Sequence, residues 1–100
     1  MLDKEQILKI LQKMKFAYAQ EGITIIGLFG SYAKETQDKY SDIDIAYEVD
    51  YETFTKRYQG GFAKLLKIDS IKKELETIFK KNVDFIPNNN KKVLKDIIYV

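Results

Sequence analysis

Two aspartates stand two residues apart in the apolar stretch "SDIDIAYEV". In a strand, side chains alternate between the two faces, so Asp42 and Asp44 would point the same way while Ile43 points into the core. Neighbouring carboxylates repel each other unless a positive group lies close to both. The segment contains no lysine, and oxygen ligands suit Mg²⁺ or Mn²⁺. The pattern therefore indicates a divalent-metal site, although a solvated strand face is the alternative.

A glycine and a serine, Gly30 and Ser31, follow the apolar segment 23–29. Glycine allows a sharp turn and the close approach of a ligand, and a helix that starts there would offer N–H groups to an anion. If segments 23–29 and 42–49 form neighbouring strands, this turn and the two aspartates share one end of a sheet. A phosphate site beside a metal site is typical of nucleotide chemistry. A Gly-Ser pair alone is equally common in ordinary turns.

The composition excludes several other kinds of chemistry. The chain contains neither cysteine nor histidine. This absence rules out Cys/His zinc sites, thiol nucleophiles, Ser-His-Asp triads and disulfide scaffolds. Of the 17 basic residues only Arg57 is an arginine, and no aromatic stacking platform is evident, which argues against direct nucleic-acid binding.

The elements that must position these residues follow from periodicity and turn signals. Asp3 is the expected N-cap of an amphipathic helix that Gly22 ends, and segment 23–29 reads as a strand buried on both faces. Segment 51–67 is ambiguous, because Gly60-Gly61 could mark a hinge, a loop or a helix start. The predicted elements are helix 4–21, strand 23–29, a short helix from 31, strand 42–49, a helix within 67–81, strand 82–87, a helical piece at 91–97 and a terminal strand at 97–100.

These elements predict one small α/β (α+β) domain over residues 1–100, with a mixed sheet flanked by helices. The beginning of the chain, "MLDKEQILKILQ", is charged and amphipathic and does not resemble a signal peptide. No apolar run approaches the ~18 residues of a membrane span. We therefore expect a cytoplasmic protein without a membrane partner.

The stretch "GSYAKETQDKYSDIDIAYEV" resembles the signature of the polymerase-beta-type nucleotidyltransferase superfamily. It is most similar to the single-domain minimal nucleotidyltransferase (MNT) proteins of the antitoxin subgroup, and the resemblance covers essentially the whole chain. It implies that Gly30 and Ser31 bind the β- and γ-phosphates of ATP. It also implies that Asp42, Asp44 and Asp84 bind two Mg²⁺ ions, or Mn²⁺ in their place.

Asp84 corresponds to the third carboxylate of the family, which also activates the attacking hydroxyl. Taken from the residues alone, an aspartate between Val83 and Phe85 could equally lie on a solvated strand face. Ser41 matches a serine commonly found before the aspartate pair, and a turn or cap role is as plausible.

Two positions beside the Gly-Ser turn complete the nucleotide-binding expectation. Lys34 occupies a position that is often basic, where it would contact phosphate or remain solvated. Glu35 departs from the usual G-S-x-A-x-G pattern. It would either accept a different loop path or place a negative charge near the phosphates and weaken binding.

The resemblance implies an activity. A minimal nucleotidyltransferase of this subgroup transfers AMP from ATP to a tyrosine of a HEPN-type toxin partner and thereby acts as an antitoxin. Two alternatives stay open from the sequence. One is a non-catalytic module that binds nucleotide or toxin, and the other is transfer to a small molecule of the aminoglycoside type.

Overall fold

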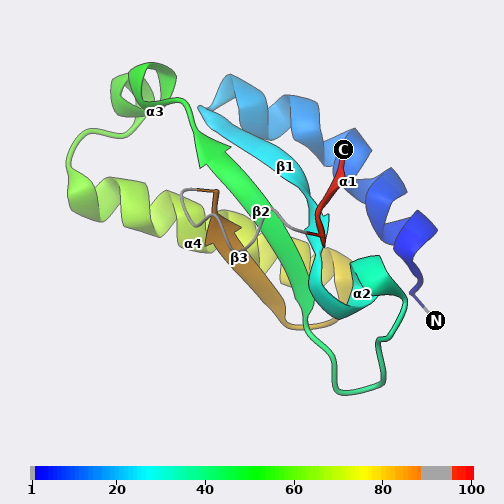
Figure 1. The fold of residues 1–100 in the computed structure, drawn as a ribbon. Coiled ribbons are helices and arrows are strands. Elements are labelled where there is room, and N and C mark those ends of the chain that lie inside the picture. Colours follow the sequence, from blue (N-terminus) through cyan, green and yellow to red (C-terminus); the bar gives the residue numbers. More distant parts are fainter. Residues whose placement is uncertain (1, 89–95) are drawn as a thin grey trace.

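The computed structural model describes residues 2–88 and 96–100 and confirms the predicted α/β class. Its four strands form one mixed sheet in the order β3-β2-β1-β4. Strand β1 is antiparallel to both β2 and β4, whereas β2 and β3 are parallel. The elements are α1 (Lys4–Gln20), β1 (Ile23–Phe29), α2 (Gly30–Lys34), β2 (Ile43–Val49), α3 (Tyr51–Arg57), α4 (Gly61–Phe79), β3 (Val83–Pro87) and β4 (Ile98–Tyr99) (Figure 1).

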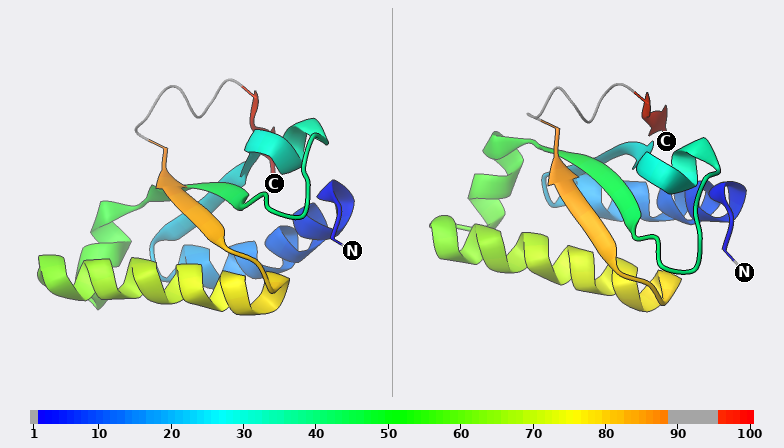
Figure 2. Two further views of the ribbon diagram at one scale, coloured as in Figure 1. Left: turned by 90° about the horizontal axis from the view of Figure 1, so that it is seen from below. Right: turned by 60° about the horizontal axis from the view of Figure 1, so that its bottom comes forward.

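Helices α1 and α4 lie together on one face of the sheet, and α2 lies on the other side, at the end of β1 (Figure 2). The core fills the space between the sheet and this pair of helices. Ile7 and Leu11 of α1 and Ile71 and Leu75 of α4 are almost completely buried. Each such side chain contributes about 1.5–3 kcal/mol when it is fully buried. The helix pair therefore fixes which face of the sheet is covered.

The alternation along β2 and β3 orients the acidic residues away from the helices. Ile43 and Ile45 are fully buried, while Asp44 between them is partly exposed. On β3, Asp84 is exposed between two buried apolar residues. The predicted orientation of Asp44, opposite to Ile43 and Ile45, is therefore confirmed.

The predicted first helix is confirmed within one residue. Asp3 caps α1, because its carboxylate accepts a hydrogen bond from the Gln6 N–H at 2.9 Å and its own N–H donates to the Gln6 side chain at 3.1 Å. The helix ends at Gln20, and Gly22 follows with a φ of 95°. A Cβ at Gly22 would lie 2.6 Å from the backbone nitrogen of Phe54, so this glycine also permits close packing of α3.

Strand β1 has the predicted bounds but not the predicted burial. Thr24, Ile26 and Phe29 are only half-buried, so the expectation of two buried faces is wrong. A register shift between Ile25 and Gly27 interrupts its pairing with β2. The uncovered face of the sheet explains the difference, because no long helix packs there in the described part of the chain (Figure 2).

The ambiguous segment contains two helices. Gly61 is the first residue of α4, so Gly60-Gly61 marks a helix start, and α3 precedes it. The helix predicted within 67–81 therefore begins earlier, at Gly61, and ends at Phe79. Most of the predicted piece at 91–97 lies outside the described residues, and the terminal strand is present as β4.

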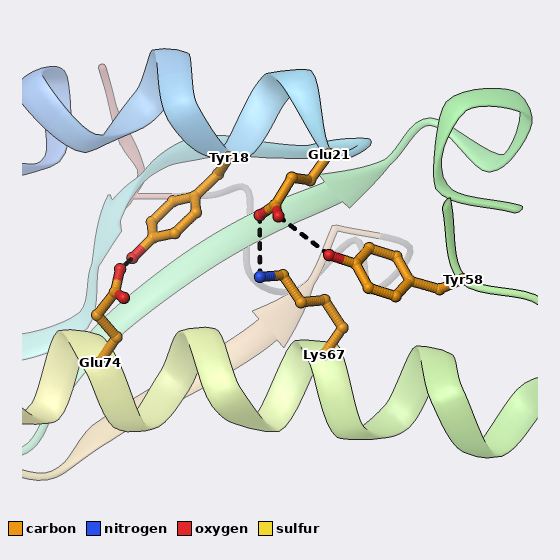
Figure 3. Close-up of polar contacts among 5 residues, drawn as sticks. All are labelled: Tyr18, Glu21, Tyr58, Lys67 and Glu74. Atoms are coloured by element: carbon orange, nitrogen blue, oxygen red, sulfur yellow. Dashed lines mark hydrogen bonds and ion pairs between the residues drawn. The ribbon is translucent and has the colours of Figure 1, made fainter. Parts of the chain in front are cut away.

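Polar side chains join α1 to α4 across the edge of the core (Figure 3). The Tyr18 hydroxyl donates a hydrogen bond to Glu74. Glu21 forms an ion pair with Lys67 at 3.0 Å and accepts a hydrogen bond from the Tyr58 hydroxyl at 3.0 Å. Burial, together with the hydrogen bond to Glu74, raises the pKa of Tyr18.

In residues 2–88 and 96–100, no helix combines the length and the apolar character that crossing a membrane requires.

Candidate functional site

Asp44 and Asp84 are direct neighbours on the parallel strands β2 and β3. They share a face of the sheet, where paired positions on adjacent strands are about 4.8 Å apart. Burial, then the hydrogen bond and charge of Asp84, and then the charge of Asp42 together raise the pKa of Asp44 to about 6. Two carboxylates held this close repel each other, and a cation between them would relieve the repulsion, so the pair suits a metal ion.

Gly30 lies against this pair. The last residue of β1, Phe29, pairs with Asp44, so the Gly-Ser turn and the aspartates share one end of the sheet, as the sequence predicts. Gly30 has a φ of 73°, and an added Cβ would lie 2.0 Å from Oδ2 of Asp44. Both the positive φ and the contact with Asp44 therefore favour glycine at position 30. The glycine therefore brings the turn into contact with the carboxylates.

Ser31 lies half-buried in α2, immediately after this contact. Helix α2 has five residues, and its N-cap residue, Phe29, provides no side-chain hydrogen bond to the first turn. No capping side chain therefore occupies the N–H groups of that turn, and a ligand can bind them. The assignment of Gly30 and Ser31 to phosphate binding stays a prediction.

Lys34 and Glu35 each form an ion pair with a distant residue. The Lys34 Nζ lies 3.3 Å from Oδ2 of Asp96, and the Glu35 Oε1 lies 3.4 Å from Nζ of Lys4. Because Lys34 is half exposed, its ion pair with Asp96 is weak and leaves the ammonium able to bind a phosphate instead. Glu35 ends α2 with a φ of 59°, the left-handed conformation that glycine adopts most easily. The glutamate thus adopts a backbone conformation that is strained for any residue with a side chain, and its effect on the loop path stays a prediction.

Ser41 stabilises the turn before β2. Its hydroxyl oxygen accepts a hydrogen bond from the Asp38 N–H at 3.0 Å, and the hydroxyl donates to Oδ1 of Asp38 at 3.3 Å. The Ser41 N–H donates to the Asp38 carbonyl at 3.1 Å. This is the turn role that sequence reasoning kept as the alternative, and contact of Ser41 with nucleotide stays a prediction.

Asp42 is exposed and lies one residue before β2, which begins at Ile43 rather than at 42. Its charge reaches Asp44, as the raised pKa of Asp44 shows. Within the described ranges 2–88 and 96–100, however, no three acidic, histidine or cysteine side chains are arranged so that they could hold a metal ion. The structure thus brings Asp44 and Asp84 together and leaves Asp42 outside a ready three-ligand group.

Sequence reasoning overlooked Lys81. Its ammonium donates hydrogen bonds to the carbonyls of Ser41 at 2.9 Å and Lys39 at 3.2 Å, in the loop that leads to Asp42. A lysine beside Lys80 in a lysine-rich chain carries no distinguishing signal. Its place two residues before the Val-Asp-Phe strand is the one hint that the sequence offers.

A pocket of about 410 Å³ lies beside this loop and does not include Asp42, Asp44 or Asp84. Its lining residues are Leu2, Tyr32, Gln37, Asp38, Lys39, Phe79 and Lys81. Gly30 and the three aspartates are not among them. We place the candidate site at the end of the sheet where Gly30 contacts Asp44 and where Asp44 pairs with Asp84, because none of these residues lines the pocket.

Similar proteins indicate the family of this chain. The model of the nucleotidyltransferase domain family matches residues 6–99. A protein of Methanocaldococcus jannaschii named "Putative protein adenylyltransferase MJ0435" is 34% identical over 96 residues, which cover 95% of this chain and 85% of that protein.

A solved structure described as a toxin-antitoxin with AMP-PNP is similar with a TM-score of 0.52 and 26% identity. The match covers 93% of this chain and 64% of the other, so this chain spans less than two thirds of that relative. The family match extends over nearly the whole sequence and includes each of the site residues above. The chain belongs to the nucleotidyltransferase domain family.

Proposed function

We propose that this nucleotidyltransferase transfers AMP from ATP to a tyrosine hydroxyl of a HEPN-type toxin partner, and so acts as an antitoxin. The observation that carries the proposal is the register of Asp44 with Asp84 next to Gly30. It joins an acidic pair to the turn expected to bind phosphate. The related M. jannaschii protein, by its name, supports a protein acceptor, and the similar toxin-antitoxin structure contains an ATP analogue.

The paired carboxylates fit a hard divalent cation. They provide oxygen donors only, and their repulsion is relieved when a cation lies between them. Asp44 and Asp84 would hold the ion, with Asp42 joining from the loop. When bound, Mg²⁺ would neutralise phosphate charge and polarise the reacting phosphoryl group. We expect Mn²⁺ to replace it, because it accepts the same ligands.

The side chains of the chain itself have three tasks in this proposal. The N–H groups at Gly30 and Ser31, with the Ser31 hydroxyl, orient the β- and γ-phosphates. Lys34 adds a positive charge on the same helix. The α-phosphorus is then presented toward the acidic pair, and pyrophosphate leaves as the new phosphodiester bond to the acceptor oxygen forms.

Asp84 is the proposed proton acceptor. A tyrosine hydroxyl has an ordinary pKa near ~10 and is a weak nucleophile at neutral pH. The exposed Asp84 carboxylate can receive its proton as the oxygen attacks. Because Asp84 lies on the open face of the sheet, a side chain of another protein can reach it.

Labelled ATP tests the proposal. Purified protein, Mg²⁺ and a lysate of the source organism are incubated with ATP labelled at the α-phosphate or, in parallel, at the γ-phosphate. We expect α-label on one protein band, without γ-label. Asp44→Asn should abolish the label, whereas Glu48→Gln, on the same face of β2 and also exposed, should retain it.

The other outcomes separate the alternatives. α-Label on a small molecule in a protein-free filtrate would replace the protein acceptor by a small-molecule acceptor. Absence of any α-label, together with ATP binding that survives in Asp44→Asn, would identify a binding module. Label that persists in Asp44→Asn would remove the acidic pair from the reaction.

A further inference from the structure

We propose that Lys81 is a positioning residue that fixes the loop before β2 and so holds Asp42 close to the Asp44–Asp84 pair. The inference rests on the proposed function, because it assigns Asp42 to the metal site. It concerns a residue to which the family signature gives no role. Lys81 contacts neither aspartate in the interactions described above, and it would act through the loop backbone.

The contacts of Lys81 are specific. Its Nζ donates to the carbonyl of Ser41 at 2.9 Å and to that of Lys39 at 3.2 Å. Lys39 and Ser41 lie on either side of Tyr40, and Ser41 directly precedes Asp42. The ammonium also lies 5.8 Å from the centre of the Tyr32 ring, on α2. One side chain, two residues before β3, thus connects that strand's start to the loop before Asp42 and to α2.

The neighbouring backbone continues the same attachment. The Ile43 N–H donates to the carbonyl of Asn82 at 3.0 Å. Lys81 by its side chain and Asn82 by its backbone therefore hold both sides of Asp42. The pairing register of β2 with β3 fixes Asp44 opposite Asp84. Asp42 lies before the paired residues of β2, so its position depends on the contacts of Lys81 and Asn82.

The loop has little else to hold it in the described part of the chain. Its other hydrogen bonds between residues 38 and 41 are local and join Asp38 to Tyr40 and Ser41. Local turns hold their own shape but do not fix a loop to the domain. A flexible Asp42 would have to be ordered when the ion binds, and that conformational entropy would weaken affinity.

Mn²⁺ binding and amide exchange test the inference. Mn²⁺ alone is titrated into the wild-type protein, Lys81→Met and Lys81→Arg, and the free ion is followed by electron paramagnetic resonance. We expect Lys81→Met to bind Mn²⁺ about 10-fold or more weakly, as when outer-sphere partners of metal ligands are lost. Lys81→Arg, which keeps the charge and donors, should recover most of the affinity.

Amide hydrogen exchange reports on the loop without the metal. In Lys81→Met we expect faster exchange at residues 39–43, with unchanged exchange in the interior of α4 and β1. The matched control is Lys80→Met, which removes a neighbouring exposed lysine. It should leave both the Mn²⁺ affinity and the exchange of residues 39–43 unchanged.

The inference is overturned if Lys81→Met keeps wild-type affinity and exchange, or if Lys80→Met weakens Mn²⁺ binding equally. Faster exchange throughout α4 and β1 would also overturn it, because Lys81 would then serve global stability. If the wild-type protein binds no Mn²⁺, the proposed metal site fails. The exchange of residues 39–43 then shows separately whether Lys81 fixes the loop.

Discussion

The Cβ that Gly30 lacks would lie 2.0 Å from Oδ2 of Asp44. Asp44 belongs to the acidic pair, so the turn and the pair cannot be altered separately. We predict that Gly30→Ala abolishes nucleotidyl transfer, because Asp44 must move away. We also expect a loss of about 1–3 kcal/mol in the free energy of unfolding, from the strained φ and the displaced carboxylate. Urea denaturation and the α-label assay measure the two effects.

Two other glycines separate the causes of that loss. Gly60 has a φ of 86° with open space around its missing Cβ, and Gly61 has open space and no positive φ. Gly60→Ala should therefore show the backbone strain alone, and Gly61→Ala should be neutral or slightly stabilising. Full transfer activity in Gly30→Ala would contradict the close contact.

A second prediction concerns the charge of the pair. Asp84→Asn should lower the pKa of Asp44 from about 6 toward its ordinary value, because one charge and its hydrogen bond are lost. Burial, the largest cause, remains, so the pKa should stay above 3.8. Carboxyl ¹³C chemical shifts measured against pH give this pKa directly. An unchanged value in Asp84→Asn, or an equal change in Glu48→Gln, would show that the two aspartates do not interact.

A third prediction concerns Glu35, whose φ of 59° is strained for any residue with a side chain. Glu35→Gly should raise the free energy of unfolding by roughly 1 kcal/mol, since relief of the strain exceeds the added chain entropy of glycine. The lost ion pair to Lys4 matters little, because Glu35 is largely exposed. Thermal denaturation measures the change.

Lys80 offers a matched comparison for Glu35, because it ends α4 with a φ of 56°. Lys80→Gly should stabilise the protein by a similar amount. Glu35→Ala keeps the strain, so it should not stabilise. If Glu35→Ala and Glu35→Gly proved equally stabilising, the effect would lie in the side chain and not in the backbone conformation.

Most of the fold is readable from local patterns. Alternation predicts β2 and the opposite directions of Asp44 and Ile43, and capping signals predict α1 from Asp3. Gly60-Gly61 is ambiguous because two glycines are compatible with a hinge or a helix start. The packing of the following residues on the sheet decides that, and periodicity contains no such information.

The acidic pair of the site is predictable in type but not in its geometry. Spacing in the sequence indicates Asp44, but its neighbour Asp84 follows 40 residues later and meets it only through the parallel pairing of β2 and β3. The contact of Gly30 with Asp44 likewise depends on the antiparallel register of β1. Lys81 escapes notice for the same reason, because its partners are backbone carbonyls, which every residue has.

The last prediction concerns the ion pair between Glu21, the residue after α1, and Lys67 of α4 (Figure 3). Burial alone would raise the pKa of Glu21, but hydrogen bonds from Lys67 and Tyr58 and the charge of Lys67 outweigh it, so the pKa is lowered. A carboxylate with a lowered folded-state pKa stabilises the protein above its unfolded-state pKa of about 4.5. This stabilisation is lost as the pH falls through the folded-state pKa.

Glu21→Gln should therefore reduce the free energy of unfolding at pH 7 by about 1 kcal/mol or less, since Glu21 is partly exposed to solvent. The difference from wild type should shrink below pH 4.5 and vanish well below it. Glu52→Gln removes an exposed pair with Lys56 at 3.6 Å and should have no measurable effect at either pH. Urea denaturation at pH 7 and at acidic pH measures both variants. A difference that does not depend on pH would show that Glu21 acts through packing and hydrogen bonds and not through its charge.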